Sequence, residues 1–151
     1  MYSKDELKQL KKKFWEGFGA YTETLPQLQH RKTKFMLYNT RLKGTALKFD
    51  ANREGAFVML EIDAKDEDRR FRLYEHFERY KVIMEQDFPD GLVWNPFYVN
   101  EVGKYICRIY TQKPGIDIHR TEHWNEFYRF MAEEMLKMEK AFRTVKEAWE
   151  E

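Results

Sequence analysis

The sequence predicts an α+β domain with a five-stranded, mostly antiparallel mixed sheet, helices on both faces, and the element order α-β-β-β-α-β-β-α. Three segments carry apolar side chains at steps of three and four residues, the spacing of one helix face. Residues 56–63 carry large apolar side chains at odd and even positions alike, which is typical of a central strand covered from both sides. A chain of 151 residues has the length of one ordinary domain, so residues 1–151 are expected to form a single unit.

The first helix is predicted to begin at a capping box, in which the Ser3 hydroxyl accepts a backbone N–H and Glu6 reaches back to the cap. It is expected to end before Pro26. Gly17 and Gly19 weaken the helix and allow close approach to the sheet. The apolar stripe of this helix comprises Leu7, Leu10, Phe14, Phe18 and Tyr21.

Three strands, at 35–40, 45–50 and 56–63, are predicted to follow as an antiparallel meander. The segments between them contain glycine and polar turn residues, which favour short connections. Because the third strand is apolar on both faces, it is expected to lie in the middle of the sheet.

Asp63 or Asp66 is predicted to cap a second helix, whose apolar stripe extends to Met84. The strands at 92–99 and 104–111 are then predicted to form a hairpin. Pro96 lacks a backbone N–H, so its strand is expected at the edge of the sheet or at a bulge.

The last helix is predicted over residues 122–150, with an apolar stripe that continues almost to the end of the chain. It would be about 40 Å long at 1.5 Å per residue, whereas the strands of a sheet span roughly 20 Å. The overhang would expose Phe142, Val145 and Trp149, and an exposed apolar patch of this kind favours association. We therefore predict a homodimer, or a site for another protein, on this end of the helix.

The composition gives little reason to expect a charged partner or a membrane. Lysine and arginine number 27 against 26 acidic residues, for a net charge of +1, so no bulk attraction to nucleic acid or membranes is expected. The single cysteine, Cys107, can form no internal disulfide, and we interpret it as a packed, inert thiol. No apolar run approaches roughly 20 residues, and the charged first residues do not resemble a signal peptide. We expect a cytoplasmic protein.

Several short, mostly aromatic motifs carry a family resemblance: Phe14-Trp15-Glu16-Gly17-Phe18-Gly19, Asn39-Thr40 leading to Gly44, Glu61-Ile62, and Gly103-Lys104 with Arg108-Ile109-Tyr110. With these motifs the chain resembles, over nearly its whole length, the bacterial family called domain of unknown function 4268. Members of that family resemble either small standalone proteins or the C-terminal part of longer, nuclease-associated ones. The resemblance implies fold boundaries but no catalytic residue, because the family has no assigned activity.

The predicted element order is also similar to the core of the PD-(D/E)xK nuclease superfamily, which holds a divalent metal with acidic residues on its second and third strands. Asp50 and Glu61 have a suitable spacing, but Asp63 stands where that motif needs lysine. In the predicted register Asp50 and Glu61 lie about 17 Å apart, which is too far for two ligands of one metal. We therefore expect a non-catalytic interaction or accessory domain, with a metal-dependent nuclease as the alternative.

One polar cluster is predicted at the end of the central strand. If Asp50 and Ala56 close their loop, Thr45 lies opposite Glu61 and Lys43 lies opposite Asp63. A charge-paired strand end explains the cluster Glu61, Asp63, Lys43 and Thr45 without chemistry, since structural ion pairs also produce such groupings. No catalytic residue, metal site or cofactor is predicted, because no Gly-rich phosphate loop, nucleophile elbow or zinc-binding cysteine pair occurs.

Two further groups of residues have both a functional and a structural interpretation. Metal-ligand types gather before the last helix, although a solvated helix N-terminus is the favoured interpretation of Asp117, His119, Glu122 and His123. A basic edge on the first helix could contact nucleic acid, but the acids spread through the chain favour a solvated face for Lys4, Lys8, Lys11, Lys12 and Lys13.

Overall fold

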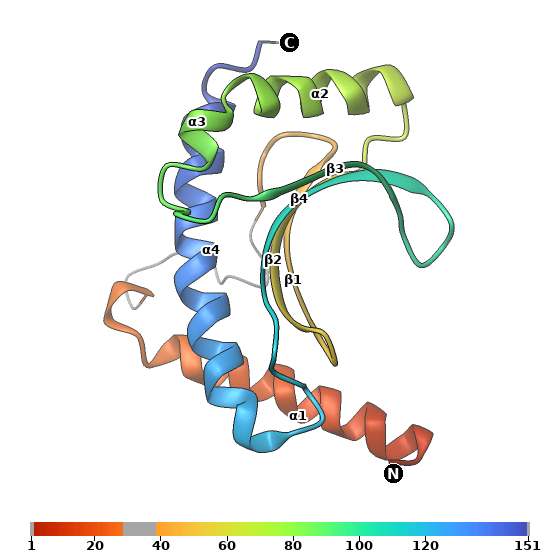
Figure 1. The fold of residues 1–151 in the computed structure, drawn as a ribbon, viewed down its shortest axis with the longest axis vertical. Coiled ribbons are helices and arrows are strands. Elements are labelled where there is room, and N and C mark those ends of the chain that lie inside the picture. The colour runs from red at the N-terminus through yellow and green to blue at the C-terminus, as the bar shows by residue number, and fades with distance from the viewer. Residues whose placement is uncertain (1, 29–38, 151) are drawn as a thin grey trace.

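The computed structural model describes residues 2–28 and 39–150, and Figure 1 shows the arrangement of its elements. The described residues form four α-helices and four strands in the order α1-β1-β2-α2-α3-β3-β4-α4, with short 3-10 helices at Pro26–Leu28 and Thr121–His123. The bounds are α1 Lys4–Glu23, β1 Thr45–Asn52, β2 Gly55–Ile62, α2 Glu67–Arg79, α3 Lys81–Met84, β3 Val93–Val99, β4 Tyr105–Lys113 and α4 Trp124–Lys146. The α+β class is therefore confirmed.

The described sheet has four strands in the order β1-β2-β4-β3, and every pairing is antiparallel. The prediction of a five-stranded mixed sheet is wrong for this part of the chain. Most of the predicted strand at 35–40 lies outside the described residues, and Asn39 and Thr40 are not in a strand. The predicted position of β2 between two partners and of β3 at an edge is confirmed.

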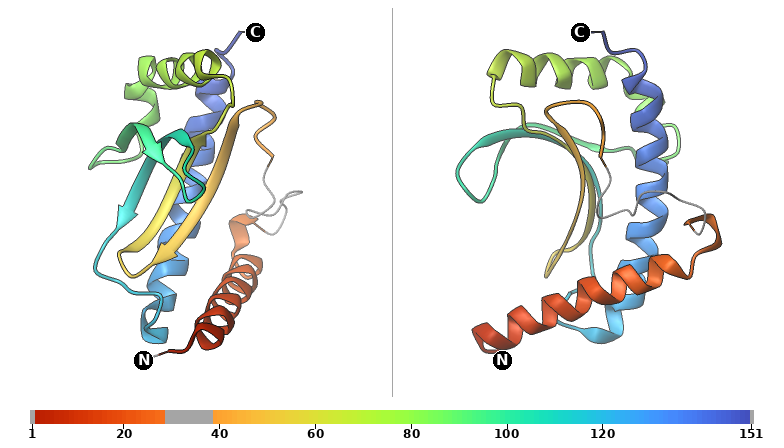
Figure 2. Two further views of the ribbon diagram at one scale, coloured as in Figure 1. Left: turned by 90° about the vertical axis from the view of Figure 1, so that its right-hand side faces the viewer. Right: turned by 180° about the vertical axis from the view of Figure 1, so that it is seen from behind.

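All the described helices lie on one side of the sheet, so the prediction of helices on both faces is wrong for the described residues. The sheet curves strongly, and α1, α2 and α4 lie against its convex face, whereas no described helix covers the concave face (Figures 1 and 2). Val58, Leu60 and Ile62 of β2 point to the convex side. There they join one core cluster with Phe14 and Phe18 of α1, Phe77 of α2, and Phe127, Met131 and Met135 of α4.

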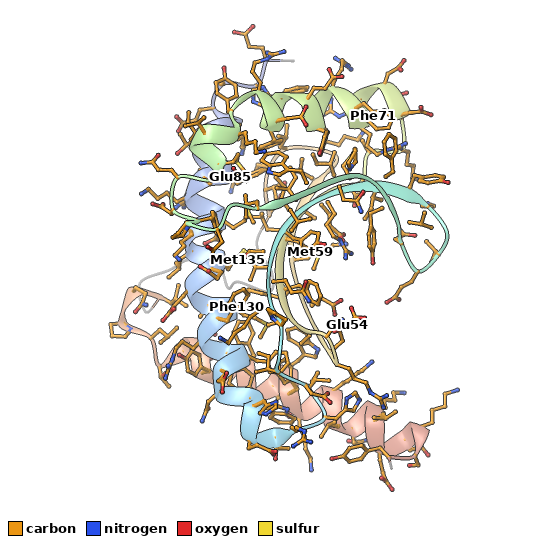
Figure 3. All side chains as sticks on the ribbon, in the orientation of Figure 1. Glu54, Met59, Phe71, Glu85, Phe130 and Met135 are labelled. Atoms are coloured by element: carbon orange, nitrogen blue, oxygen red, sulfur yellow. The ribbon has the colours of Figure 1, made fainter. Side chains whose placement is uncertain are left out.

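The concave face of β2 is buried without a covering helix. Phe57 and Met59 point to this side and are 9% and 2% exposed. Curvature brings the side chains of neighbouring strands together over them, and the ring of Tyr110 on β4 lies 5.9 Å from that of Phe57. Figure 3 labels Met59 on this side and Met135 on α4, which lies on the convex side of the sheet. The apolar residues on both faces of β2 therefore predicted correctly that both faces are buried, but not which elements cover each face.

The turn between β1 and β2 sets a register that differs by one residue from the predicted one. Asn52 pairs with Gly55, so only two residues form the turn, and Thr45 lies opposite Ile62 rather than Glu61. Gly55 has φ +124°, and a Cβ there would lie 2.0 Å from the carbonyl oxygen of Lys113. Only glycine fits this conformation and this close approach, which keeps the strands paired up to the turn.

The helix ends follow the predicted caps. The reciprocal capping box of Ser3 and Glu6 begins α1, and Asp66 caps α2. The second predicted helix is divided at Tyr80 into α2 and α3. Helix α4 is shorter than predicted, and its 23 residues span about 35 Å.

Gly17 provides close approach between two helices rather than to the sheet. A Cβ on Gly17 would lie 2.3 Å from the hydroxyl of Tyr128 on α4, whereas Gly19 has no neighbour within 4 Å. The Tyr128 hydroxyl donates to the carbonyl oxygen of Phe14 at 2.8 Å, so a side chain at 17 would displace this contact. Within the described residues, no helix has the length and apolar character needed to cross a membrane.

Candidate functional site on the concave face and the β3–β4 hairpin

A row of four polar or aromatic side chains crosses the concave face, one from each strand. Glu61 of β2 accepts two hydrogen bonds from Arg108 of β4, at 3.1 Å from Nε and 2.6 Å from Nη2. Its other carboxylate oxygen lies 2.8 Å from Nζ of Lys48 on β1. The Arg108 guanidinium lies 3.7 Å from the ring centroid of Tyr98 on β3. We call these four residues the cross-strand row.

The cross-strand row neutralises a buried carboxylate. Glu61 is only 4% exposed, and each of its carboxylate oxygens contacts a cation. Both Arg108 bonds go to the same oxygen, Oε2, and such charge-assisted hydrogen bonds are among the stronger polar contacts in proteins, whereas the half-exposed Lys48 contributes less. The row lines a hollow of about 340 Å³ together with Asp50, Asn100 and Glu101. Its arrangement fixes the relative positions of the four strands.

The predicted polar cluster does not assemble. Lys43 and Asp63 form no ion pair with each other in the described part of the chain. Arg69 donates to the Lys43 carbonyl oxygen at 2.9 Å, and the Asp63 N–H donates to the Gly44 carbonyl oxygen. The Thr45 hydroxyl bonds to that of Thr40 at 2.9 Å. The one-residue change in register is the reason, because it places Thr45 on the convex side, away from Glu61.

The true partners of Glu61 were missed by the sequence analysis, although one signal pointed to them. A carboxylate on a strand buried on both faces needs a cation nearby, because an unpaired buried charge is costly. The cations on the two neighbouring strands are Lys48 on β1 and Arg108 and Lys113 on β4, and only Lys48 and Arg108 lie near Glu61. Identifying these partners requires the register of both strand pairings, whereas the predicted register covers only β1 with β2 and differs from the structure by one residue.

The geometry offers no metal site of the nuclease type. Asp50 lies opposite Phe57, four residues from Glu61 along β2, which corresponds to about 13 Å. Both oxygens of Glu61 already contact cations. No group of three or more His, Cys, Asp or Glu side chains in the described ranges could hold a metal ion.

The predicted exposed end of α4 is covered by α2, so this prediction is wrong. Phe142 and Val145 are buried, and Trp149 is half-buried. The Phe142 ring stacks on Phe77 at 5.6 Å, and His76 Nε2 lies 2.8 Å from the Val145 carbonyl oxygen. The overhang does not exist because α2 packs across this end of α4 (Figure 1).

The histidines before α4 make local contacts. His119 Nδ1 lies 2.7 Å from Oδ1 of Asp117, and the Asp117 N–H donates to Nδ1 of His123. Burial raises the pKa of Asp117, but hydrogen bonds from His119 and its charge outweigh this and hold the pKa below its usual value. These contacts order the segment that leads into α4.

Cys107 is buried on the convex side of β4. Burial raises the pKa of its thiol to about 11, although the nearby Arg70 guanidinium opposes the shift. A thiol with such a pKa stays protonated at neutral pH, and the thiolate is the reactive form. The interpretation of Cys107 as a packed, inert thiol agrees with this environment.

The hairpin of β3 and β4 carries the most prominent apolar surface of the described chain. It extends past the N-terminal end of α2 (Figure 1). Among the described residues, five of the eight exposed large apolar side chains lie on it. Four of them surround its turn, and we call these the hairpin patch: Phe97 (65% exposed), Val99 (50%), Val102 (76%) and Tyr105 (59%).

The hairpin patch is held in one conformation by its turn and by α2. The side-chain oxygen of Asn100 accepts from the N–H groups of Val102 and Lys104, at 3.1 and 2.9 Å. Val99 and Tyr105 are direct cross-strand partners and so point to the same side. Phe97, next to Pro96 at the bulge, contacts the ring of Phe71 on α2 at 5.8 Å. Sequence reasoning found the hairpin but gave no sign that its apolar residues remain uncovered.

These features define an α+β domain whose curved antiparallel sheet carries helices on its convex face and presents an apolar hairpin at its edge. The chain belongs to the family described as Domain of unknown function (DUF4268), whose model matches residues 10–146. No curated protein and no solved structure gives a significant match.

Proposed function

We propose that this chain is a non-catalytic protein-interaction module of the bacterial cytoplasm, and that it binds its partner through the hairpin patch. The observation that carries the proposal is the gathering of exposed apolar side chains around one turn. Apolar side chains scattered singly need no explanation, whereas a contiguous exposed group marks an interaction site. Phe97 and Tyr105 supply the aromatic type that is enriched at protein interfaces.

The rigidity of the hairpin supports this function. The cross-strand row ties Tyr98 and Arg108 of the hairpin to β2 and β1, and Asn100 orders the turn. A surface that is already ordered loses less conformational entropy on binding, so more of its contact energy appears as affinity. Pro96 and the adjacent bulge interrupt the outer edge of β3, which disfavours binding by addition of a further strand. Side-chain contact on the patch is therefore the favoured mode.

The nuclease alternative has less support from the geometry than this proposal. It needs at least two carboxylates near one metal position, and Glu61 is instead held between Arg108 and Lys48. The interaction proposal uses residues that have no role in the core, because Val99, Val102 and Tyr105 are exposed.

Site-specific photo-crosslinking in cells of the source organism tests the proposal. A photoreactive amino acid replaces Val102 in one variant and Val82 of α3 in a matched control, since both side chains are highly exposed (76% and 86%). We expect a discrete crosslinked product from position 102 and none from position 82. Adding Tyr105→Asp to the first variant is expected to abolish the product, because it places a charge in the patch.

The comparison between positions 102 and 82 tests whether binding is specific to the hairpin patch. Equal crosslinking from 82 and 102, or a product that survives Tyr105→Asp, would contradict binding through the hairpin patch. A circular dichroism melt of each variant verifies that the fold is retained, as expected for changes at exposed positions.

A further inference from the structure

A cavity with a positive lining adjoins the hairpin patch. It has a volume of about 780 Å³ and lies between the loop after β2, the first turns of α2 and the turn of the hairpin. Val102 and Tyr105 belong both to its wall and to the hairpin patch. Its charged lining residues are Lys65, Arg70, Lys104 and Asp63. Three cations thus face one carboxylate beside an exposed apolar surface.

Arg70 has hydrogen-bonding capacity that the described chain does not use. Its Nη1 donates to the Ala64 carbonyl oxygen at 3.2 Å, whereas its Nε is buried and has no acceptor in the described part of the chain. Its guanidinium lies 5.2 Å from the Phe71 ring, which holds the group against α2. A guanidinium presents five N–H donors that match the oxygens of a carboxylate.

The acidic residues near the cavity leave its positive character intact. Asp66, Glu67 and Asp68 precede Arg70 on α2, but they do not line the cavity, and Asp66 accepts from the Arg69 N–H as the helix cap. Glu101 lines the hollow on the concave side instead. Lys65 and Lys104 are exposed and can turn toward a ligand. The cavity is therefore complementary to a negatively charged group.

We infer that the partner of this module presents an acidic peptide segment with an apolar anchor. In this arrangement the anchor packs on Val102 and Tyr105, and its neighbouring carboxylates enter the cavity toward Arg70, Lys65 and Lys104. The inference rests on the proposed function and adds the chemistry of the partner to it. The rings of Phe97 and Tyr105 could pack on either a peptide or a base, but the aliphatic side chains of Val99 and Val102 cannot stack on bases, so a peptide is favoured over nucleic acid.

Selection of short random peptides displayed on phage against the intact chain tests the inference. We expect the selected sequences to combine aspartate or glutamate with an aliphatic or aromatic residue. A selected peptide is then measured by fluorescence anisotropy against the chain, against Lys65→Glu/Lys104→Glu, and against Lys8→Glu/Lys11→Glu. The last pair makes the same charge change on α1, where both lysines are exposed and outside the cavity.

The affinity is expected to fall about tenfold or more with Lys65→Glu/Lys104→Glu and to change less than about twofold with the α1 pair. Arg70→Gln is expected to weaken binding as well, and replacing the peptide's acids by their amides should have the same effect. Higher salt is expected to weaken binding through screening of these charges.

The outcomes separate this inference from the proposed function. Selected peptides that contain no acidic residues would contradict an acidic partner but not the proposed function. The same holds if peptide binding is unaffected by Lys65→Glu/Lys104→Glu but is lost with Tyr105→Asp. Binding unaffected by either change would overturn both. A single-stranded oligonucleotide that binds more tightly than the peptide, and is lost in the cavity variant, would overturn the peptide in favour of nucleic acid.

Discussion

The convex and concave faces of one sheet are buried in different ways. The convex face packs the apolar residues of β2 against three helices, in a cluster that includes Leu60, Ile109 and Phe77. The concave face has no covering helix in the described chain, and an ion pair of Glu61 and Arg108 lies beside Met59. Apolar packing is non-directional and supplies most of the stability, whereas the directional contacts of a charge pair define position. We therefore expect the two faces to respond differently to substitution.

The largest effect is expected for Leu60→Ala on the convex face. Leu60 is fully buried in the core cluster, so truncation leaves a cavity and should lower the free energy of unfolding by about 2–5 kcal/mol. Urea denaturation followed by circular dichroism measures the change. Val102→Ser, on the exposed hairpin patch, is the control and should change stability by no more than about 0.5 kcal/mol. Similar losses for both variants would remove the distinction between core and surface.

The concave face is tested by Glu61→Gln. This change keeps the shape of the side chain but leaves the largely buried Arg108 without its charged acceptor, so a loss of about 2–3 kcal/mol is expected. Lys48→Gln, on the half-exposed partner, should cost less than about 1 kcal/mol. Chemical denaturation of both variants and of Glu61→Gln/Lys48→Gln gives the coupling energy. Equal costs for the two single changes would show that Arg108 is not the main partner.

A smaller effect is expected from the alkaline titration of Cys107. Burial raises the pKa of its thiol to about 11 from an ordinary value of 9.0, so the native state retains a proton that the unfolded chain loses. The resulting stability is complete below about pH 9 and is lost as the pH rises toward 11, with about 1 kcal/mol lost by pH 10. Burial also raises the pKa values of Tyr74 and Tyr128 from 10.0 to about 12, so the stability that they contribute is lost between about pH 10 and pH 12.

Stability measured between pH 8 and pH 10 in the native chain and in Cys107→Ala checks this expectation. The variant should start at lower stability, because it loses a buried side chain, but its stability should decline less steeply with pH. Parallel pH profiles would show that the thiol does not retain its proton in the native state.

The smallest effect is expected from divalent metal. Both oxygens of Glu61 contact cations, and no three His, Cys, Asp or Glu side chains of the described residues are grouped to hold a metal ion, so magnesium or manganese should leave the thermal midpoint unchanged. A ligand that binds only the native state must raise that midpoint. Differential scanning calorimetry with and without manganese measures it. A rise that Glu61→Gln removes would revive the metal-dependent alternative.

Local signals in the sequence predicted most of the elements. The Ser3–Glu6 capping box, the Asp66 cap and the Pro96 bulge all act through residues that are neighbours in the chain, and each occurs as predicted. The central position of β2 was also predictable, because its apolar residues on both faces exclude an exposed strand.

The features that the sequence could not predict depend on contacts between distant segments. Phe142 and Val145 are buried because α2 packs against them. The apolar stripe of a helix shows which face is buried but not which element covers it. The predicted polar cluster does not form because the register of β1 and β2 differs by one residue from the predicted one. Side chains alternate along a strand, so a shift of one residue moves each partner to the other face of the sheet. The exposure of Tyr105 and Val102 could not be predicted from the sequence either. The periodicity of apolar residues indicates which side chains share a face, but not whether another element covers that face.

The strand order has a consequence for folding kinetics. β1–β2 and β3–β4 are local hairpins that can form early, whereas β2 and β4 must meet across the chain of α2, α3 and β3. We expect the docking of two preformed hairpins to limit the folding rate, and Glu61 and Arg108 lie on the two strands, β2 and β4, that meet in this step. A stopped-flow experiment should find that Arg108→Met slows folding, and that changes at the hairpin turns also slow folding, because the turn contacts form before the barrier. If Arg108→Met only speeds unfolding, the ion pair forms after the barrier. The same two side chains would thus set both the final alignment of the sheet and the rate at which the chain reaches it.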